Sequence, residues 1–372
     1  MIDTVCLTLP YDSLVLLEEN NKAVPQWDLQ SRTANYSKHV RTPSKAHKES
    51  GLYFPRLTIY SRRFGQQPSV KIEFSVPKLI FNNNLEELTD KHFDEVINAL
   101  QDRLQKMGIR VFKQVLASAP ISTVHFSKNF LLEDGYTSSY VISELQKIDL
   151  RKSFDFAKAR YINNGQSICA HTRSHELVIY DKIADLGKTK KRAIDKDQTP
   201  VQLSLLDSLK SKDTLVEVLR VEVRLCNKQK INSVFKKLNL PQNPTFQEVF
   251  NSRVSKAVVS QYWESVIKAD QLALFTIDRP AKEILRETCR GDPRLKPKQA
   301  IYQVGLALLA KDGDGLTELR SIFDSRTNDR GWYRIKNDFK QISTNTYPQQ
   351  IRSWISQIEK QIRTYKPLTK IL

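Results

Sequence analysis

The chain has 372 residues, 40% of them hydrophobic and 27% charged, which is the composition of a globular protein with enough core for two or three domains. Its 59 Lys and Arg residues against 41 Asp and Glu residues give a formal net charge of +18. An excess of this size favours a polyanionic partner, most often nucleic acid. The alternatives are a basic protein with no such partner and one that binds an anionic membrane.

The four cysteines are far apart and form no C-x-x-C pair, which argues against a zinc cluster and a disulfide framework. No segment reaches the roughly 18 apolar residues that a membrane span requires. The first residues have no basic stretch before an apolar one, so we expect no signal peptide. We therefore expect a cytoplasmic protein without a membrane partner.

Alternating apolar and polar residues predict strands through much of the first 240 residues. The expected strands are 4–9, 57–61, 69–76, 121–127, a segment around Ile168, 176–182 and 219–225. Helices are expected over 90–107, with Thr89 as N-cap, over 138–148, and briefly before Lys210. The fold class is therefore α+β, with a central, mainly antiparallel sheet and flanking helices.

The pattern changes after about residue 239. Pro241 and Pro244 interrupt the chain, and the capping-box sequence from Thr245 to Glu248 opens a long helix. Helical patterns continue to the end, with no strong strand signal. We expect an α+β domain at 1–240 and an all-helical domain at 241–372.

Three of the expected strands are apolar on one face and reactive on the other, because successive side chains of a strand point to opposite faces. In the first strand, the side chain of His125 points to the face opposite Val124 and Phe126. Tyr180 and Lys182 share a face in the second strand. Arg220, Glu222 and Arg224 share a face in the third. If these strands are neighbours, a His, a Tyr and a Glu converge on one surface.

Such a surface suits phosphodiester cleavage by tyrosine, which requires a deprotonated phenol, an offset phosphate charge and a stabilised leaving oxygen. A basic neighbour helps to lower the pKa of the phenol, and arginines hold phosphate oxygens. Tyr180 is the predicted nucleophile, and Lys182 is predicted to activate it. The predicted ligands of Mg²⁺ or Mn²⁺ are His125, Glu222 and Asp181. The residues predicted to bind DNA are Arg220, Arg224, Lys188, Lys190, Lys191 and Arg192.

Each of these residues also has a purely structural interpretation. Strand tyrosines usually pack at a sheet surface, a lone strand histidine is usually hydrogen-bonded, and Arg-x-Glu-x-Arg is often a ladder of surface ion pairs. Asp181 and Lys182 can simply end a strand. His171 and His175, in an expected loop, are alternative metal ligands.

The order of the motifs resembles the replication initiators of filamentous phages, of the gene II protein type, and related plasmid Rep proteins. The matching segments are MID at the start, VKIEFSVPKL at 70–79, ISTVHFSKNF at 121–130, LVIYDK at 177–182 and VLRVEVRL at 218–225. The C-terminal PKQAIYQVGLALL, GLTELRSIF and GWYRIKNDFKQI segments resemble the helical tail of that family.

This resemblance implies an HUH/Rep-endonuclease-like sheet and an enzyme of the bacterial host cytoplasm that starts rolling-circle replication. Such initiators nick one strand of a supercoiled duplex at an origin, become linked to its 5′ phosphate through a tyrosine and leave a 3′-OH primer. They later rejoin the displaced single strand. The resemblance places the nucleophile at Tyr180 and a metal ligand at Glu222.

The chain departs from the family pattern at the strand of His125. In the relatives this strand more often carries an R-x-D pattern, and His125 stands at the Asp position. A His-hydrophobic-His pair, typical of the wider nuclease class, is absent because Ser127 occupies the place of a second His. The metal identity and the participation of a second tyrosine, such as Tyr161, stay open.

Two other functions compete with this enzyme. A non-catalytic initiator or repressor would bind DNA and recruit host enzymes, and EDTA would not affect it. A basic structural or packaging protein would bind DNA without sequence preference. The helical tail is expected to contact duplex DNA through a helix-turn-helix-like arrangement, with a host helicase or polymerase as the alternative.

Overall fold

A computed structural model describes most of the chain. The described residues are 1–17, 38–41, 50–60, 67–150, 158–162, 165–186, 216–268, 280–323, 329–345 and 353–369.

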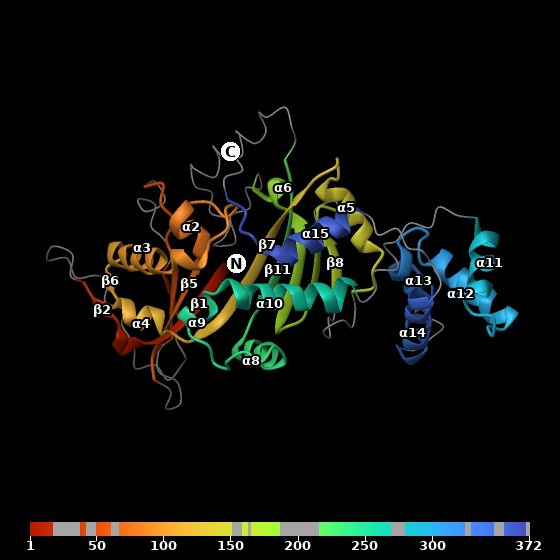
Figure 1. Cartoon of the computed structure of the whole chain (residues 1–372). Helices are drawn as coiled ribbons and strands as arrows, with labels where there is room; N and C mark the ends of the chain where they lie inside the picture. Colours follow the sequence, from red (N-terminus) through yellow and green to blue (C-terminus); the bar gives the residue numbers. More distant parts are fainter. Residues whose placement is uncertain are drawn as a thin grey trace.

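A single antiparallel sheet dominates the described residues (Figure 1). It has nine strands in the order β3-β4-β5-β1-β7-β11-β10-β9-β8, and every neighbouring pair is antiparallel. The strands are β1 Ile2–Pro10, β3 Lys38–Arg41, β4 Arg56–Tyr60, β5 Ser69–Ser75, β7 Ile121–Leu132, β8 Lys158–Ile162, β9 Ser167–His171, β10 His175–Asp181 and β11 Glu217–Leu225. Two short strands, β2 (Val15–Leu16) and β6 (Ile109–Arg110), pair separately. The predicted α+β class is confirmed.

The three strand segments that carry His125, Tyr180 and Glu222 lie next to one another, which is the condition for a shared site. β11 pairs with β7 on one side and with β10 on the other. The apolar side chains of β7 and β11 are buried in one continuous core, whereas His125 and Arg224 on the opposite face are partly exposed. We call this second face the polar face.

Helices cover the apolar face of the sheet. Phe246 of α9 (Phe246–Val249) lies 5.7 Å from Phe74 of β5, between ring centroids. Phe235 of α8 (Lys228–Lys237) lies 6.4 Å from Phe126 of β7. The helix α10 (Ser252–Tyr262) runs across the strands and contacts β7 and β11 (Figure 1). These aromatic contacts join chain segments that are more than 100 residues apart.

Both predicted N-caps are confirmed. Thr89 forms a capping box with His92 before a 3₁₀ turn at Asp90–His92 and the helix α3 (Phe93–Lys106). Thr245 forms the predicted capping box with Glu248. The long helix expected after it is broken, however, because Phe250 leaves the helical region at ψ 62° and Asn251 starts α10 with a cap of its own.

The remaining helices flank the sheet or follow it in the chain. They are α2 Val76–Phe81, α4 Lys113–Ala117, α5 Ser138–Gln146, α6 Lys182–Leu186, a π-helical turn at Trp263–Ile267, α11 Ala281–Gly291, α12 Pro297–Leu309, α13 Gly315–Phe323, α14 Asp329–Asn345 and α15 Ser353–Thr364. Within the described ranges, no helix has both the length and the apolar character that crossing a bilayer demands.

The region after residue 240 is helical, but it does not form one separate unit as predicted. Buried side chains of α10 and α15 belong to the same core as the sheet, and the Ser255 and Tyr365 hydroxyls lie 2.7 Å apart. Helices α12, α13 and α14 instead surround a small second core. With α11 they lie beyond the β8 side of the sheet (Figure 1), and we call α11–α14 the helical module. The predicted boundary at 240 therefore cuts through the main core.

A buried polar network attaches the helical module to the segment after α5. The carboxylate of Asp149 accepts hydrogen bonds from Nη1 of Arg320 (3.0 Å) and Nε1 of Trp332 (2.9 Å). Its backbone carbonyl accepts one from Nζ of Lys336 (3.2 Å). Because Asp149 is only 1% exposed, these donors replace the water that the carboxylate loses on burial.

Candidate functional site

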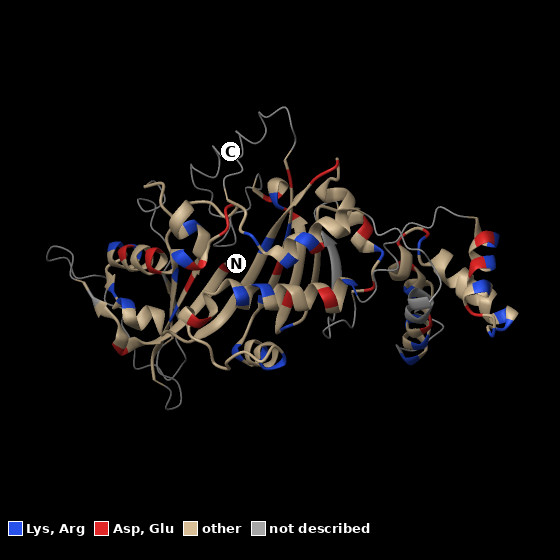
Figure 2. Ribbon diagram, in the orientation of Figure 1, with Lys and Arg blue, Asp and Glu red and all other residues tan. Residues whose placement is uncertain are grey.

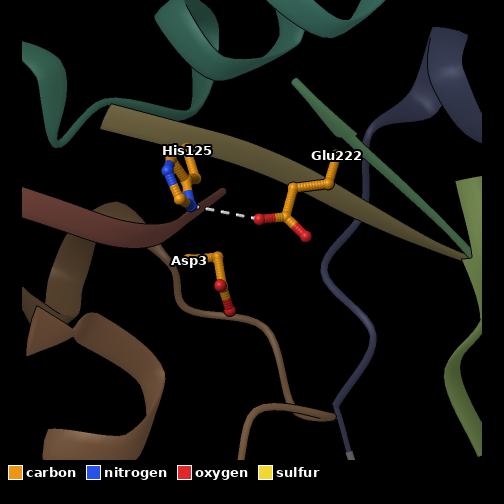
Figure 3. A group of neighbouring side chains, drawn as sticks. All are labelled: Asp3, His125 and Glu222. Atoms are coloured by element: carbon orange, nitrogen blue, oxygen red, sulfur yellow. Dashed lines mark ion pairs between the residues drawn. The ribbon is translucent and has the colours of Figure 1, made fainter. Parts of the chain in front are cut away.

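Asp3, His125 and Glu222 meet on the polar face, one from each of three neighbouring strands (Figure 3). They come from β1, β7 and β11, and each offers a ligand atom that lies within 4.8 Å of the other two. Nitrogen and oxygen ligands bind divalent first-row metals at about 2.0–2.2 Å, so donors around one ion are a few ångströms apart. This group, which we call the Asp-His-Glu cluster, can therefore hold a metal ion after small side-chain adjustments.

A β-bulge in β1 places Asp3 in this cluster. Thr4 lies opposite His125 in register, but Ile2 lies opposite Phe126, so the pairing shifts between these two residues. Asp3 is the extra residue, and its carboxylate accepts a hydrogen bond from the Thr4 hydroxyl (3.1 Å). Strict alternation would put Asp3 on the apolar face with Val5, whereas a bulge redirects one side chain.

Glu222 is the most connected member of the cluster. It is 1% exposed, and its Oε1 lies 3.2 Å from Nδ1 of His125 and 3.0 Å from Nε of Arg224. Burial alone would raise the pKa of Glu222, but Arg224 and His125 outweigh burial and lower it well below its usual value. Glu222 is therefore ionised at neutral pH, as a metal ligand must be.

The structure gives Arg220 a different role from the predicted DNA binding, because its guanidinium holds the carboxylate of Asp3. Its guanidinium is 2% exposed and donates from Nη2 to Asp3 Oδ1 (2.5 Å) and to the Ser127 hydroxyl (2.8 Å). Nη1 donates to the backbone carbonyl of Asn84 (2.6 Å). A guanidinium that is buried and committed to these acceptors cannot also hold a phosphate oxygen.

Breaking the Arg220–Asp3 pair should be costly for the fold. We expect Arg220→Gln to lower the free energy of unfolding by about 3–5 kcal/mol, because Asp3 would stay buried without its counter-charge. Urea denaturation in EDTA measures this without any contribution from a metal. Lys268→Gln is the control, since its ion pairs with Glu264 (3.2 Å) and Glu359 (3.5 Å) are partly exposed and should each contribute less than about 1 kcal/mol. A loss below about 1 kcal/mol for Arg220→Gln would contradict the assigned role.

Tyr180 lies beside the Asp-His-Glu cluster. It comes from β10, opposite Arg220, and its hydroxyl donates a hydrogen bond to Oε2 of Glu222 (3.3 Å). The side chain is partly exposed. Burial nevertheless raises the pKa of the phenol well above its usual value, opposed by Arg220 and reinforced by Glu222. Without an added positive charge the phenol is therefore neutral near pH 7.

Lys182 lies over the ring of Tyr180, with Nζ 5.8 Å from the ring centroid. It is the first residue of α6, just past the end of β10, and is fully buried. Within the described residues its Nζ has no hydrogen-bond partner, and burial together with the charge of Arg220 lowers its pKa to about 7. The predicted proximity to Tyr180 is confirmed, but Lys182 carries only part of its charge at neutral pH.

Asp181, predicted as a metal ligand, is not a member of the cluster. It follows Tyr180 in β10 and therefore points to the other side of the strand. Its Oδ1 accepts a hydrogen bond from the backbone N–H of Ala184 (2.9 Å), which caps the start of α6. Asp3 supplies the second carboxylate instead.

Arg224 is the predicted phosphate-binding residue that retains access to solvent. Its side chain is 27% exposed, and Nη1 lies 3.2 Å from a carboxylate oxygen of Glu176. Lys188, Lys190, Lys191 and Arg192, also predicted to bind DNA, lie outside the described residues. The side chain of Tyr161 is likewise not described.

The two alternative histidine ligands lie apart from the cluster. His175 is 1% exposed, and its Nδ1 is 3.0 Å from the Thr172 hydroxyl. His171 is on β9, opposite Glu176 in register, two strands away from Glu222. Of the histidines in the described part of the chain, His125 is the one that joins the metal-binding group.

Comparison with known protein families, curated proteins and solved structures found no match to this chain. The family resemblance of the motifs therefore stays a prediction.

The donor set determines what the Asp-His-Glu cluster can do. Three protein ligands leave positions around a cation open for water and for a substrate oxygen. One imidazole and two carboxylates form a mixed nitrogen and oxygen set that suits Mn²⁺, while the carboxylates also suit Mg²⁺. The cluster can thus place a positive charge close to the phenol of Tyr180.

Asp3 is the member of the Asp-His-Glu cluster that the sequence did not predict. The signal was a carboxylate inside a strand of otherwise apolar residues, in Met1-Ile2-Asp3. A buried acid needs a partner, so such a residue is a candidate ligand. The bulge that aims it at His125 has no comparable signal in the sequence.

Proposed function

We propose that this protein is a metal-dependent DNA endonuclease and strand transferase that uses Tyr180 as its nucleophile and initiates rolling-circle replication. The observation that supports it most is the 3.3 Å contact between the Tyr180 phenol and Glu222, a member of the Asp-His-Glu cluster. A nucleophile and a metal-binding group thus share one face of the sheet. The net charge of +18 suits a DNA substrate.

Each residue has a defined part in the reaction. The phenol of Tyr180 gives its proton to solvent. Its oxygen forms a bond to phosphorus, and the bond from phosphorus to the 3′ oxygen breaks. That oxygen takes up a proton and becomes the 3′-OH primer, while the 5′ phosphate stays on Tyr180. Rejoining runs the same steps in reverse.

The surrounding charges support this chemistry. Asp3, His125 and Glu222 would hold Mg²⁺ or Mn²⁺, which offsets phosphate charge and lowers the pKa of a nearby phenol. Arg224, whose side chain is 27% exposed, would turn from its contacts with Glu222 and Glu176 to hold a phosphate oxygen. Arg220 keeps Asp3 in position through the 2.5 Å contact between Nη2 and Oδ1.

Nicking of supercoiled DNA tests the proposal. The protein is incubated with a supercoiled plasmid that carries the DNA upstream of its own coding sequence, with Mn²⁺, with Mg²⁺ or with EDTA. We expect relaxed, protein-linked DNA with Mn²⁺ and none with EDTA, because the phenol needs the cation. Relaxation that is equally fast in EDTA, or DNA that stays supercoiled with both Mn²⁺ and Mg²⁺, would contradict the proposal.

A non-catalytic DNA-binding initiator that recruits host enzymes is the second candidate. It is favoured by the ion pairs Asp3–Arg220 and Glu222–Arg224, which neutralise both carboxylates of the cluster without a metal. In that case the network only stabilises the sheet. This candidate predicts DNA binding that EDTA does not change and no covalent adduct.

A further inference from the structure

The helix α11 of the helical module carries a stripe of positive charge. Lys282, Arg286 and Arg290 are spaced four residues apart, so they lie on one side of the helix, and all three are exposed. Ile284 and Thr288, on the opposite side, are each 1% exposed and pack inward. At 1.5 Å per residue the stripe is about 12 Å long.

The positive charge continues through the turn into α12. Arg294, Lys296 and Lys298 are all exposed within the five-residue turn and the first turn of α12. None of these three, nor the three of the α11 stripe, forms an ion pair with any other described residue. Figure 2 shows Lys and Arg along α11 and at the adjoining end of the module, with acidic residues between them on α11. These six cations are free to meet a polyanion.

The start of α12 also exposes apolar side chains that its own core does not use. Ile301 is 61% exposed and Tyr302 is 45% exposed, whereas Ala300 and Val304 on the other side are buried. The Tyr302 hydroxyl contacts Asp338 of α14 at 3.1 Å, which holds its ring in place. Lys298 lies four residues before Tyr302 and therefore on the same side of α12.

We propose that α11, the turn 292–296 and α12 form a helix-turn-helix surface for duplex DNA, separate from the tyrosine site. The six cations contact phosphates on the DNA backbone. The N-terminal turn of α12, with Lys298, Gln299 and Ile301, enters the major groove, which is about 12 Å wide and admits one helix. Apolar side chains at this position contact thymine methyl groups, which explains why Ile301 is left exposed.

Charge and shape favour duplex DNA over other partners of this surface. A membrane surface would favour a continuous apolar stripe beneath the cations, but α11 packs its apolar residues inward. Three large apolar side chains are exposed on α12, those of Ile301, Tyr302 and Leu309, and the six cations at its N-terminal end outnumber them, which favours nucleic acid over a protein partner. The surface does not share residues with the Asp-His-Glu cluster, so DNA binding here does not depend on the nicking reaction.

The salt dependence of duplex binding tests the surface. Binding of the full chain to a fluorescent duplex is measured in EDTA, where no nicking is expected, between about 50 and 200 mM salt. We expect the triple variant Arg286→Gln, Arg290→Gln and Arg294→Gln to reduce the slope of log K against log salt by about 3, one per lost phosphate contact. All three residues are exposed, so folding should not change.

A triple variant of α8 is the matched control. Lys228→Gln, Lys236→Gln and Lys237→Gln remove the same charge from exposed positions on another helix. We expect the control to keep the wild-type slope within about 1 unit. An unchanged slope for the α11 variant, or an equal reduction by both variants, would overturn the proposal. Neither result would affect the proposed tyrosine chemistry, because nicking is scored separately.

Discussion

Tyr180→Phe is expected to lower covalent adduct formation by about a thousandfold or more, while duplex binding stays at the wild-type level. The phenylalanine ring keeps the packing against Lys182 but lacks the oxygen that would bond to phosphorus. Among the described residues, the hydrogen bond lost is the 3.3 Å contact to Glu222, which keeps His125 and Arg224 as partners. The measurement is transfer of a labelled 5′ phosphate to the protein in denaturing gels, together with binding by fluorescence anisotropy.

Tyr140→Phe is the control for this experiment. Tyr140 is 39% exposed on α5, outside the polar face, so its variant should form the adduct at the wild-type rate. Full adduct formation by Tyr180→Phe would place the nucleophile elsewhere in the chain. Loss of the adduct together with loss of DNA binding would show that Tyr180 acts on binding and not on the chemistry.

His125→Ala is expected to weaken Mn²⁺ binding by more than about 100-fold, because it removes one of the three protein ligands. Among these ligands His125 is the best to remove, since it is partly exposed and its loss leaves the Asp3–Arg220 and Glu222–Arg224 ion pairs intact. The fold should therefore survive, and the change in affinity reports on the metal site itself. Isothermal titration calorimetry with Mn²⁺ alone gives the dissociation constant.

His171→Ala is the matched control for the metal experiment. His171 lies on the same face of the sheet, on β9, and outside the Asp-His-Glu cluster. Its variant should bind Mn²⁺ with wild-type affinity and should nick DNA normally. Equal Mn²⁺ affinity of His125→Ala and the wild type would contradict the assigned ligand set, and the second candidate function would then be favoured.

Alternation within single strands was predictable from the sequence. Val124 and Phe126 are buried and His125 is partly exposed, as the period of two requires. In β11, Val221 and Val223 likewise point to the face opposite Glu222, although Glu222 is buried as well. Which side chains share a face is a local property of an extended backbone, so it can be derived from the residues alone.

The identity of the second carboxylate was not predictable in this way. Asp181 lies next to Tyr180 in the sequence, yet its side chain caps α6. Asp3 is more than 100 residues away from both His125 and Glu222, and a bulge in β1 directs it to them. The free energy that favours such a bulge comes from pairing with β5 and β7, which no local pattern contains.

The role of Arg220 depended on burial. Arg220, Glu222 and Arg224 alternate along β11 in the same pattern, and the sequence treats the two arginines alike. In the structure Arg220 is 2% exposed and holds Asp3, whereas the side chain of Arg224 is 27% exposed. Arg220 also donates to the backbone carbonyl of Asn84 (2.6 Å), a contact between segments more than 100 residues apart that no local pattern contains.

The amino-acid order by itself determined the α+β class, the helix caps at Thr89 and Thr245, and the reactive faces that carry His125, Tyr180 and Glu222, because each follows from contacts within a few residues. Only the tertiary structure decided that β11 lies between β7 and β10, that Asp3 completes the cluster, and that α10 and α15 share the core of the sheet. These depend on pairing and burial between segments far apart in the chain, where the hydrophobic contribution comes from the whole core.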